Sequence, residues 1–133
     1  MSVLSNPRSG SQRAALAGAL FGFTGVAAGA FGAHALRARL GPDALAVFET
    51  AVRYQLVHAL ALFGSSWAVQ QWPGRAASAS AILFGIGIIA FSGSLYALSL
   101  SGVHLLGALT PFGGVLLLLG WLALALAAYR GPH

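Results

Sequence analysis

Three histidines, His34, His58 and His104, carry the side chains of this sequence that are best suited to bind a metal ion. Three imidazoles form a known type of zinc or copper site. Their separations along the chain match no local ligand motif, however, and there is no cysteine to add a thiolate. Met1 is the only methionine, so haem or copper has no internal thioether ligand. We predict no metal site and no cofactor, and a histidine-based metal or haem protein is the least favoured hypothesis.

Ser92 and Ser94 raise the possibility of nucleophilic hydrolysis, with a histidine as the base. The strained-turn motif that usually exposes a nucleophilic serine does not accompany them. The two acids, Asp43 and Glu49, lie at the edge of the apolar segments, whereas proton translocation calls for an acid deep in the membrane. We therefore predict no catalytic residue, and the sequence favours a protein that is not an enzyme.

The segments that carry these residues are typical of a membrane protein. No charged residue lies between Arg75 and Arg130, and 58% of the 133 residues are hydrophobic. Because lipid cannot satisfy backbone polar groups, such a chain is expected to cross the bilayer as α-helices. The basic residues flank the apolar runs instead of clustering on one face, so we expect the lipid bilayer and no nucleic acid as a partner. The predicted fold is an all-α integral membrane protein, a four-transmembrane-helix bundle.

The chain is predicted to form one membrane domain over residues 1–133, in which residues 1–12 are a polar N-terminal leader. Arg8 and Arg13 before the first apolar run also fit a cleaved signal peptide, although the run is longer than the usual hydrophobic region of one. The hydrophobic pattern predicts spans at about 14–33, 52–72, 76–98 and 107–129.

Proline positions predict where two helices begin. Pro42 and Asp43 indicate a helix that Asp43 caps. For the last helix, Thr110 and Pro111 are compatible with two different start positions. In one, Thr110 caps the helix and Pro111 is its first residue; in the other, the helix begins near Val103 and kinks at Pro111.

The first span carries a stripe of glycines that recur three or four residues apart and therefore share one helix face. Small residues at such spacing let two helix backbones approach closely in lipid. A phosphate-binding loop is not indicated, since the sequence has neither GxGxxG nor a P-loop lysine. We predict that this face is a helix-packing seam and a possible homo-oligomer interface, formed by Gly18, Gly22, Gly25, Gly29 and Gly32.

Polar residues converge at one end of the predicted bundle. This end, which we call the loop side, holds the connection between the first two spans and the connection between the last two. Polar side chains in hydrocarbon usually face the bundle interior, so they form either a packing network or a binding site for a small solute, an ion or a lipid headgroup. The candidates are His34, Tyr54, Gln55, His58, Ser92, Ser94, Tyr96 and Thr110.

The arginines give a small bias in orientation. With four spans, both termini lie on one side, together with Arg8, Arg13, Arg75 and Arg130; the opposite side holds Arg37, Arg39 and Arg53. Under the positive-inside rule, this balance predicts that both termini are cytoplasmic.

Four sequence blocks occur in a recognisable order: Gly29–His34, Thr50–His58, Phe91–Tyr96 and Thr110–Gly114. With these blocks the chain resembles the YgdD-like small bacterial inner-membrane proteins, which have relatives among small eukaryotic transmembrane proteins. The resemblance implies a multi-pass inner-membrane protein, usually of four helices. It implies no activity, since the family is known as a domain of unknown function.

Three functional hypotheses follow. The favoured one is an accessory, assembly or scaffold component that acts in a homo-oligomer or with a membrane-complex partner. The alternative is a binder or conduit for a small solute or lipid, which uses the polar intramembrane cluster. The third is the metal or haem protein described above.

Overall fold

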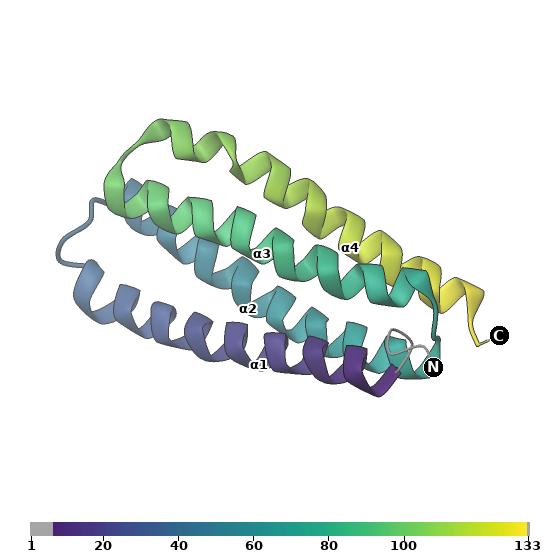
Figure 1. Cartoon of the computed structure of the whole chain (residues 1–133). Helices are drawn as coiled ribbons and strands as arrows, with labels where there is room; N and C mark the ends of the chain where they lie inside the picture. The colour runs from purple at the N-terminus through teal and green to yellow at the C-terminus, as the bar shows by residue number, and fades with distance from the viewer. Residues whose placement is uncertain (1–6, 133) are drawn as a thin grey trace.

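The structure, a computed structural model, describes residues 7–132 and consists of four long helices joined by short connections (Figure 1). Consecutive helices run antiparallel, so both ends of the described chain lie beside the connection between the second and third helices. We call this end the terminus side. The elements are α1 (Pro7–Phe31), the π-helical turn η2 (Gly32–Leu36), α2 (Pro42–Gln71), α3 (Arg75–Ser101), the 3₁₀ turn η3 (His104–Ala108) and α4 (Thr110–Arg130).

The helices pack mainly on their neighbours in the chain. Helix α1 lies along α2, α2 along α3, and α3 along α4. Over residues 7–132, α1 and α4 do not contact each other, and α1 touches α3 only slightly. The bundle is therefore open, with α2 and α3 in the middle and α1 and α4 at its two edges (Figure 1).

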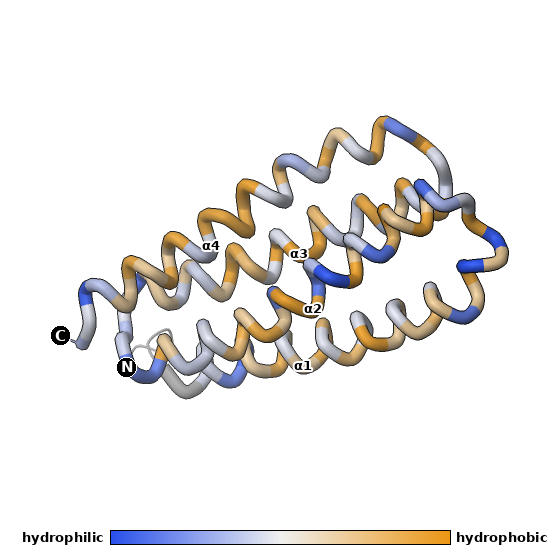
Figure 2. The backbone as a smooth tube through the Cα atoms, turned by 180° about the vertical axis from the view of Figure 1, so that it is seen from behind, coloured by the Kyte–Doolittle hydropathy of each residue, from blue (hydrophilic) through white to orange (hydrophobic). Residues whose placement is uncertain are grey.

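The expected all-helical architecture is confirmed, and three helical segments are long and apolar enough to cross a membrane. These segments are Ser9–Leu36, Arg75–Ser101 and His104–Arg130. Helix α2 is not among them, because polar residues such as Arg53 and His58 lower its hydropathy (Figure 2). Length and composition thus support three of the four predicted spans.

The polar residues of α2 follow from its central position. Its buried side chains include Gln55 and His58, which face the neighbouring helices. Its exposed large side chains are mostly apolar, among them Val57, Leu60 and Phe63. This is the reverse of a water-soluble helix and suits a helix whose outer surface meets lipid.

The helix starts differ in part from the predictions. Gly41 is the N-cap of α2 and the helix begins at Pro42, so the prediction that Asp43 caps it is wrong. Proline suits the first helical position, because the N–H it lacks would have no partner there. At the last helix, a separate 3₁₀ turn starts at His104, close to the earlier of the two predicted starts. Helix α4 itself starts at Thr110, next to the later one. Thr110 makes no capping hydrogen bond.

Predicted leader and helix overlap at the N-terminus. Residues 1–6 of the leader lie outside the described part of the chain, whereas residues 7–12 belong to α1. Helix α1, which is also the segment compatible with a signal peptide, packs along α2 over its length.

The glycine stripe of α1 faces α2 of the same chain. A Cβ atom added to Gly18 would lie 2.9 Å from the carbonyl oxygen of Ala59, and one added to Gly32 would lie 2.8 Å from the Phe48 ring. Gly25 and Gly29 similarly abut Leu56 and Val52, whereas a Cβ at Gly22 would meet nothing within 4 Å. Most of this face is thus covered by α2 within the chain.

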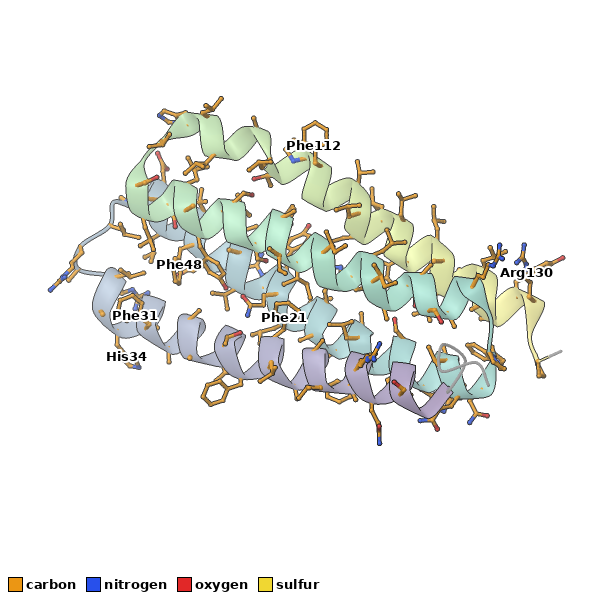
Figure 3. All side chains as sticks on the ribbon, viewed as in Figure 1. Phe21, Phe31, His34, Phe48, Phe112 and Arg130 are labelled. Atoms are coloured by element: carbon orange, nitrogen blue, oxygen red, sulfur yellow. The ribbon has the colours of Figure 1, made fainter. Side chains whose placement is uncertain are left out.

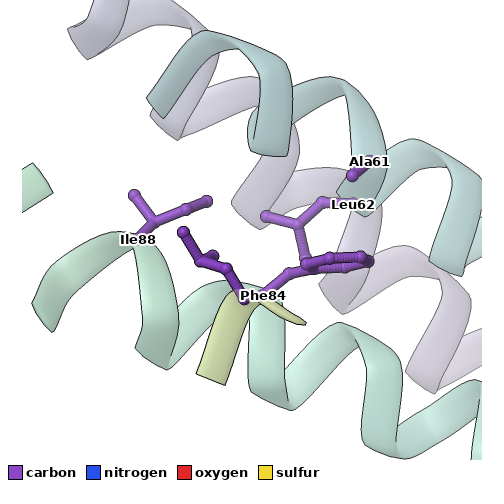
Figure 4. Packing of buried hydrophobic residues seen from close by; sticks show 5 residues of the cluster. Ala61, Leu62, Phe84 and Ile88 are labelled. Atoms are coloured by element: carbon purple, nitrogen blue, oxygen red, sulfur yellow. The ribbon is translucent and has the colours of Figure 1, made fainter. Parts of the chain in front are cut away.

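Apolar side chains of the three later helices form the centre of the structure. Ala61 and Leu62 from α2 meet Phe84 and Ile88 from α3 (Figure 4), and Leu117 from α4 completes the cluster. Phe84 is fully buried. This core fixes α2 against α3 and so sets the positions of the polar side chains on both.

Candidate functional site

Gln55 joins three helices through its side-chain amide. Its Nε2 donates to the backbone oxygen of Phe21 at 2.9 Å and to Oγ1 of Thr24 at 2.8 Å, both on α1. Its Oε1 accepts a hydrogen bond of 2.7 Å from the hydroxyl of Tyr96 on α3. The side chain is only 5% exposed, and this Gln55 network ties both neighbours to α2.

His58 uses both ring nitrogens within the protein. Nε1–H of Trp121 on α4 donates to its Nε2 at 3.0 Å, which assigns the ring proton to Nδ1. Nδ1 then donates to the backbone oxygen of Tyr54 at 2.7 Å. The Tyr54 ring is partly exposed and lies 4.4 Å from the ring of Phe91, measured between centroids.

The candidate serines on α3 also have partners. Ser92 donates to the backbone oxygen of Ala51 at 2.7 Å, which links α3 to α2. Ser94 and Thr110 share a hydrogen bond of 2.7 Å between their hydroxyl oxygens, which links α3 to α4. Among the described residues, neither serine has the hydrogen bond to a histidine that would activate a hydrolytic nucleophile.

His34 does not join the other candidates. It lies in η2 at the loop side, exposed and pointing away from the bundle (Figure 3). His104 is exposed in η3. Over the described residues, no three side chains of histidine, cysteine or acid come close enough to hold a metal ion. Within residues 7–132, six of the eight candidates take part in hydrogen bonds between helices through their side chains, namely Gln55, His58, Ser92, Ser94, Tyr96 and Thr110, whereas His34 and the Tyr54 hydroxyl do not.

Two further groups of polar residues that link helices are not among the eight candidates. At the terminus side, Ser11 bonds Ser66 at 2.8 Å, and Gln70 donates to Ser11 at 2.6 Å, which joins α1 to α2. Ser65 and Ser80 share a hydrogen bond of 2.8 Å between α2 and α3. Their signal in the sequence is the same as that of the candidates, a small polar residue within an apolar run.

Polar pairing extends to the whole described structure. Among the described residues, every buried side-chain nitrogen or oxygen has a hydrogen-bond partner. Such interhelical bonds fix register in lipid, since an unpaired polar group in hydrocarbon is costly. The geometry of the cluster is thus that of interhelical hydrogen bonds that hold the helices in register.

Two hollows lie one after the other between α1 and α3, with α2 beneath both, and together we call them the groove. Its loop-side half encloses about 350 Å³ beside Phe21, Thr24, Gln55 and Ile89, and its exposed lining is almost entirely apolar. Its terminus-side half encloses about 410 Å³ and has a more polar lining. The groove exists because α1 and α3 diverge over α2, each packing on it from a different side.

Comparison with known proteins identifies the family. A model described as "Protein of unknown function (DUF423)" matches residues 28–114. The chain belongs to the DUF423 family. The resemblance to YgdD-like proteins is therefore confirmed, and the chain is a membrane protein of a family whose description names no activity.

Curated relatives of this DUF423 chain cover most of its length. A UPF0382 membrane protein of Staphylococcus epidermidis is 41% identical over an alignment of 119 residues, and the match covers 85% of this chain and 92% of the relative. YwdK of Bacillus subtilis, also named a UPF0382 membrane protein, is 38% identical over 115 residues, or 85% and 93% of the two chains. The UPF0382 inner membrane protein YgdD of Escherichia coli is 39% identical over 112 residues, or 84% and 86%. No solved structure matches.

The DUF423 match includes all eight candidate residues. Thr24 and Trp121, which the structure adds as hydrogen-bond partners of Gln55 and His58, lie outside the matched range. Backbone oxygens of Phe21, Ala51 and Tyr54 also serve as acceptors, and such groups leave no mark in a sequence.

Replacing Trp121 with phenylalanine is expected to lower the free energy of unfolding by about 1 kcal/mol, because it removes the donor to His58 and leaves Nε2 unpaired. The control is Trp67→Phe, since the Trp67 side chain is exposed and makes no hydrogen bond to another described residue. Thermal unfolding in detergent compares the two variants. Equal midpoints would show that the bond between Trp121 and His58 adds nothing to stability.

Proposed function

We propose that the chain is a four-span component of the bacterial inner membrane that acts by binding within the bilayer, as an accessory or scaffold protein, without catalysis. The groove between α1 and α3 carries this proposal. Both of its halves are open to the surface, while the buried polar groups around them are hydrogen-bonded within the protein. Because these polar groups are already hydrogen-bonded within the protein, they fit a rigid binding surface better than a reactive centre.

The length of α2 and the character of its surface support a fourth span. The helix has 30 residues, which correspond to about 45 Å and exceed the ~30 Å hydrocarbon core. Its polar side chains at Gln55 and His58 are buried by neighbouring helices, which lowers the cost of placing them in lipid. The arginine balance supports cytoplasmic termini.

Single cysteines test this topology directly, because the chain contains none of its own. We expect Ala38→Cys, between α1 and α2, to react with a membrane-impermeant maleimide on intact spheroplasts. Pro73→Cys, between α2 and α3, is expected to react only after the membrane is permeabilised.

Two other labelling patterns would contradict parts of the proposal. Labelling of both cysteines from the same side would show that α2 does not cross the membrane. Labelling of Pro73→Cys alone on intact spheroplasts would keep four spans and reverse the orientation. Pro132→Cys, at the other end of the described chain, is expected to behave like Pro73→Cys.

Photo-crosslinking tests whether the groove is a binding surface. Ile89 lines the groove on α3 and is 64% exposed, and Leu118 on α4 lies outside it and is 65% exposed. We expect a photoreactive amino acid at position 89 to give one dominant adduct of defined mass in native membranes. The same residue at position 118 is expected to give adducts that follow the bulk lipid composition. Matching adduct distributions at the two positions would overturn the binding function.

A further inference from the structure

The two halves of the groove differ in charge, and this difference points to an occupant. Arg13 and Ser78 line the terminus-side half, whereas the loop-side half has no charged lining residue. We propose that the terminus-side groove binds an anionic phospholipid. Its phosphate lies at Arg13 and Ser78, and one acyl chain lies over Leu62 and Val69. This inference rests on the proposed binding function and specifies the ligand.

Arg13 is available for an external anion. It is exposed, and it lies in the second turn of α1, beside the part of α2 that holds Ser66 and Gln70. The two acids of the chain, Asp43 and Glu49, are in the first turns of α2, at the loop side. Glu49 and Ser66 are about 25 Å apart along the helix. Within residues 7–132, no side-chain carboxylate thus neutralises Arg13.

The length of the terminus-side groove along α1 is close to the thickness of one leaflet of the hydrocarbon core. Arg13 and Phe21 are about 12 Å apart along α1, close to the ~15 Å that separates the edge of the hydrocarbon core from its centre. An acyl chain whose headgroup lies at Arg13 therefore ends near Phe21, where the loop-side half of the groove begins.

The walls of the terminus-side groove suit an acyl chain. The side chains that line the two walls are small, at Ala14 and Ala17 on α1 and at Ala81 on α3, and they leave space between the walls. The floor is formed by Leu62 and Val69, whose apolar side chains are buried. The polar lining side chains are Arg13 and Ser78, near the start of α1 and of α3, and we call this end the mouth of the groove. Their guanidinium and hydroxyl groups offer hydrogen-bond donors to a phosphate. This combination matches one charged headgroup and one apolar chain.

Native mass spectrometry of the full-length protein in detergent tests the proposal. The probes are phosphatidylglycerol and phosphatidylcholine with the same acyl chains, added at equal concentration. We expect phosphatidylglycerol to be retained preferentially. Arg13→Gln is expected to lower its retention roughly five-fold, the effect of one basic side chain on binding to anionic lipid. Arg39→Gln, the same change at an exposed loop-side position outside the groove, is expected to leave retention unchanged.

A second variant tests the position of the acyl chain. Gly10 lines the mouth of the groove, and a Cβ there would lie 3.7 Å from Val69, which is an ordinary contact. The fold thus has room for a Cβ at position 10. We expect the longer side chain of Gly10→Leu to occupy the groove and to reduce retention of both lipids. Equal retention of the two lipids by the original chain, or no effect of either variant, would overturn the inference.

Failure of this inference and failure of the binding function are distinguishable. A dominant protein adduct in the photo-crosslinking experiment, together with lipid retention that is insensitive to Arg13→Gln, would identify a partner helix as the occupant. It would overturn the lipid site and retain the binding function. If lipid retention is insensitive to Arg13→Gln and photo-crosslinking at position 89 gives no dominant adduct, both the lipid site and the binding function are overturned.

Discussion

Gly113→Ala is expected to lower the free energy of unfolding by about 3 kcal/mol, at the upper end of the usual cost of over-packing. Gly113 is buried where α4 crosses α3. A Cβ atom there would lie 2.7 Å from Cα of Phe91 and 2.8 Å from the backbone carbon of Ala90. Because these atoms belong to the backbone of α3, no side-chain rotation relieves the clash, and the two helices must separate.

The neighbouring glycine provides a matched control for this change. A Cβ on Gly114 would lie 3.7 Å from the Phe91 ring, an ordinary contact, so Gly114→Ala is expected to be neutral or to stabilise the helix by up to about 1 kcal/mol. Unfolding by SDS in mixed micelles, followed by circular dichroism, measures both variants. Equal stability of the two variants would mean that α3 and α4 do not approach so closely at Gly113.

Gln55→Leu is expected to lower the free energy of unfolding by about 2 kcal/mol. The change removes three interhelical hydrogen bonds, each worth about 0.6 kcal/mol on average in a membrane protein, and leaves the Tyr96 hydroxyl without its acceptor. Since the bonds reach both α1 and α3, we also expect the groove to widen. Photo-crosslinking at position 89 should then lose its dominant adduct.

Gln71→Leu is the control for this substitution. Gln71 is exposed at the end of α2, so the same change of side chain is expected to alter stability by less than about 0.5 kcal/mol. Tyr96→Phe removes only one of the three bonds and should have a smaller effect than Gln55→Leu. If Gln55→Leu unfolds at the same SDS fraction as Gln71→Leu, the network does not hold the helices together.

Much of the fold follows from the positions of the charged residues. The uncharged stretch between Arg75 and Arg130 predicts two long apolar helices, and α3 and α4 occupy this stretch. The N-cap of α2 was predicted wrongly because proline and aspartate are both common at helix starts, and only backbone geometry separates the first position from the cap. The openness of the bundle is not visible in the sequence, since all four helices have exposed apolar surfaces.

The polar links are predictable by residue type and not by partner. Gln55 and His58 stand out as polar residues on an otherwise apolar helix, and the structure buries both. Thr24 carries a similar signal in α1, as a polar residue in the middle of an apolar run. Trp121 carries none, because a tryptophan in a membrane segment is compatible with packing, with the interface or with hydrogen bonding. Only the crossing of α2 and α4 brings it to His58.

The order in which the helices pack has a consequence for biogenesis. Each helix finds its main partner in the segment that precedes it, and the described parts of α1 and α4 never meet. A chain that enters the bilayer from its N-terminus can thus dock each new hairpin as it emerges, without waiting for a distant segment to close a ring. Assembly during translation then needs only local contacts, and a ribosome-bound intermediate that ends after α3 already contains both walls and the floor of the groove.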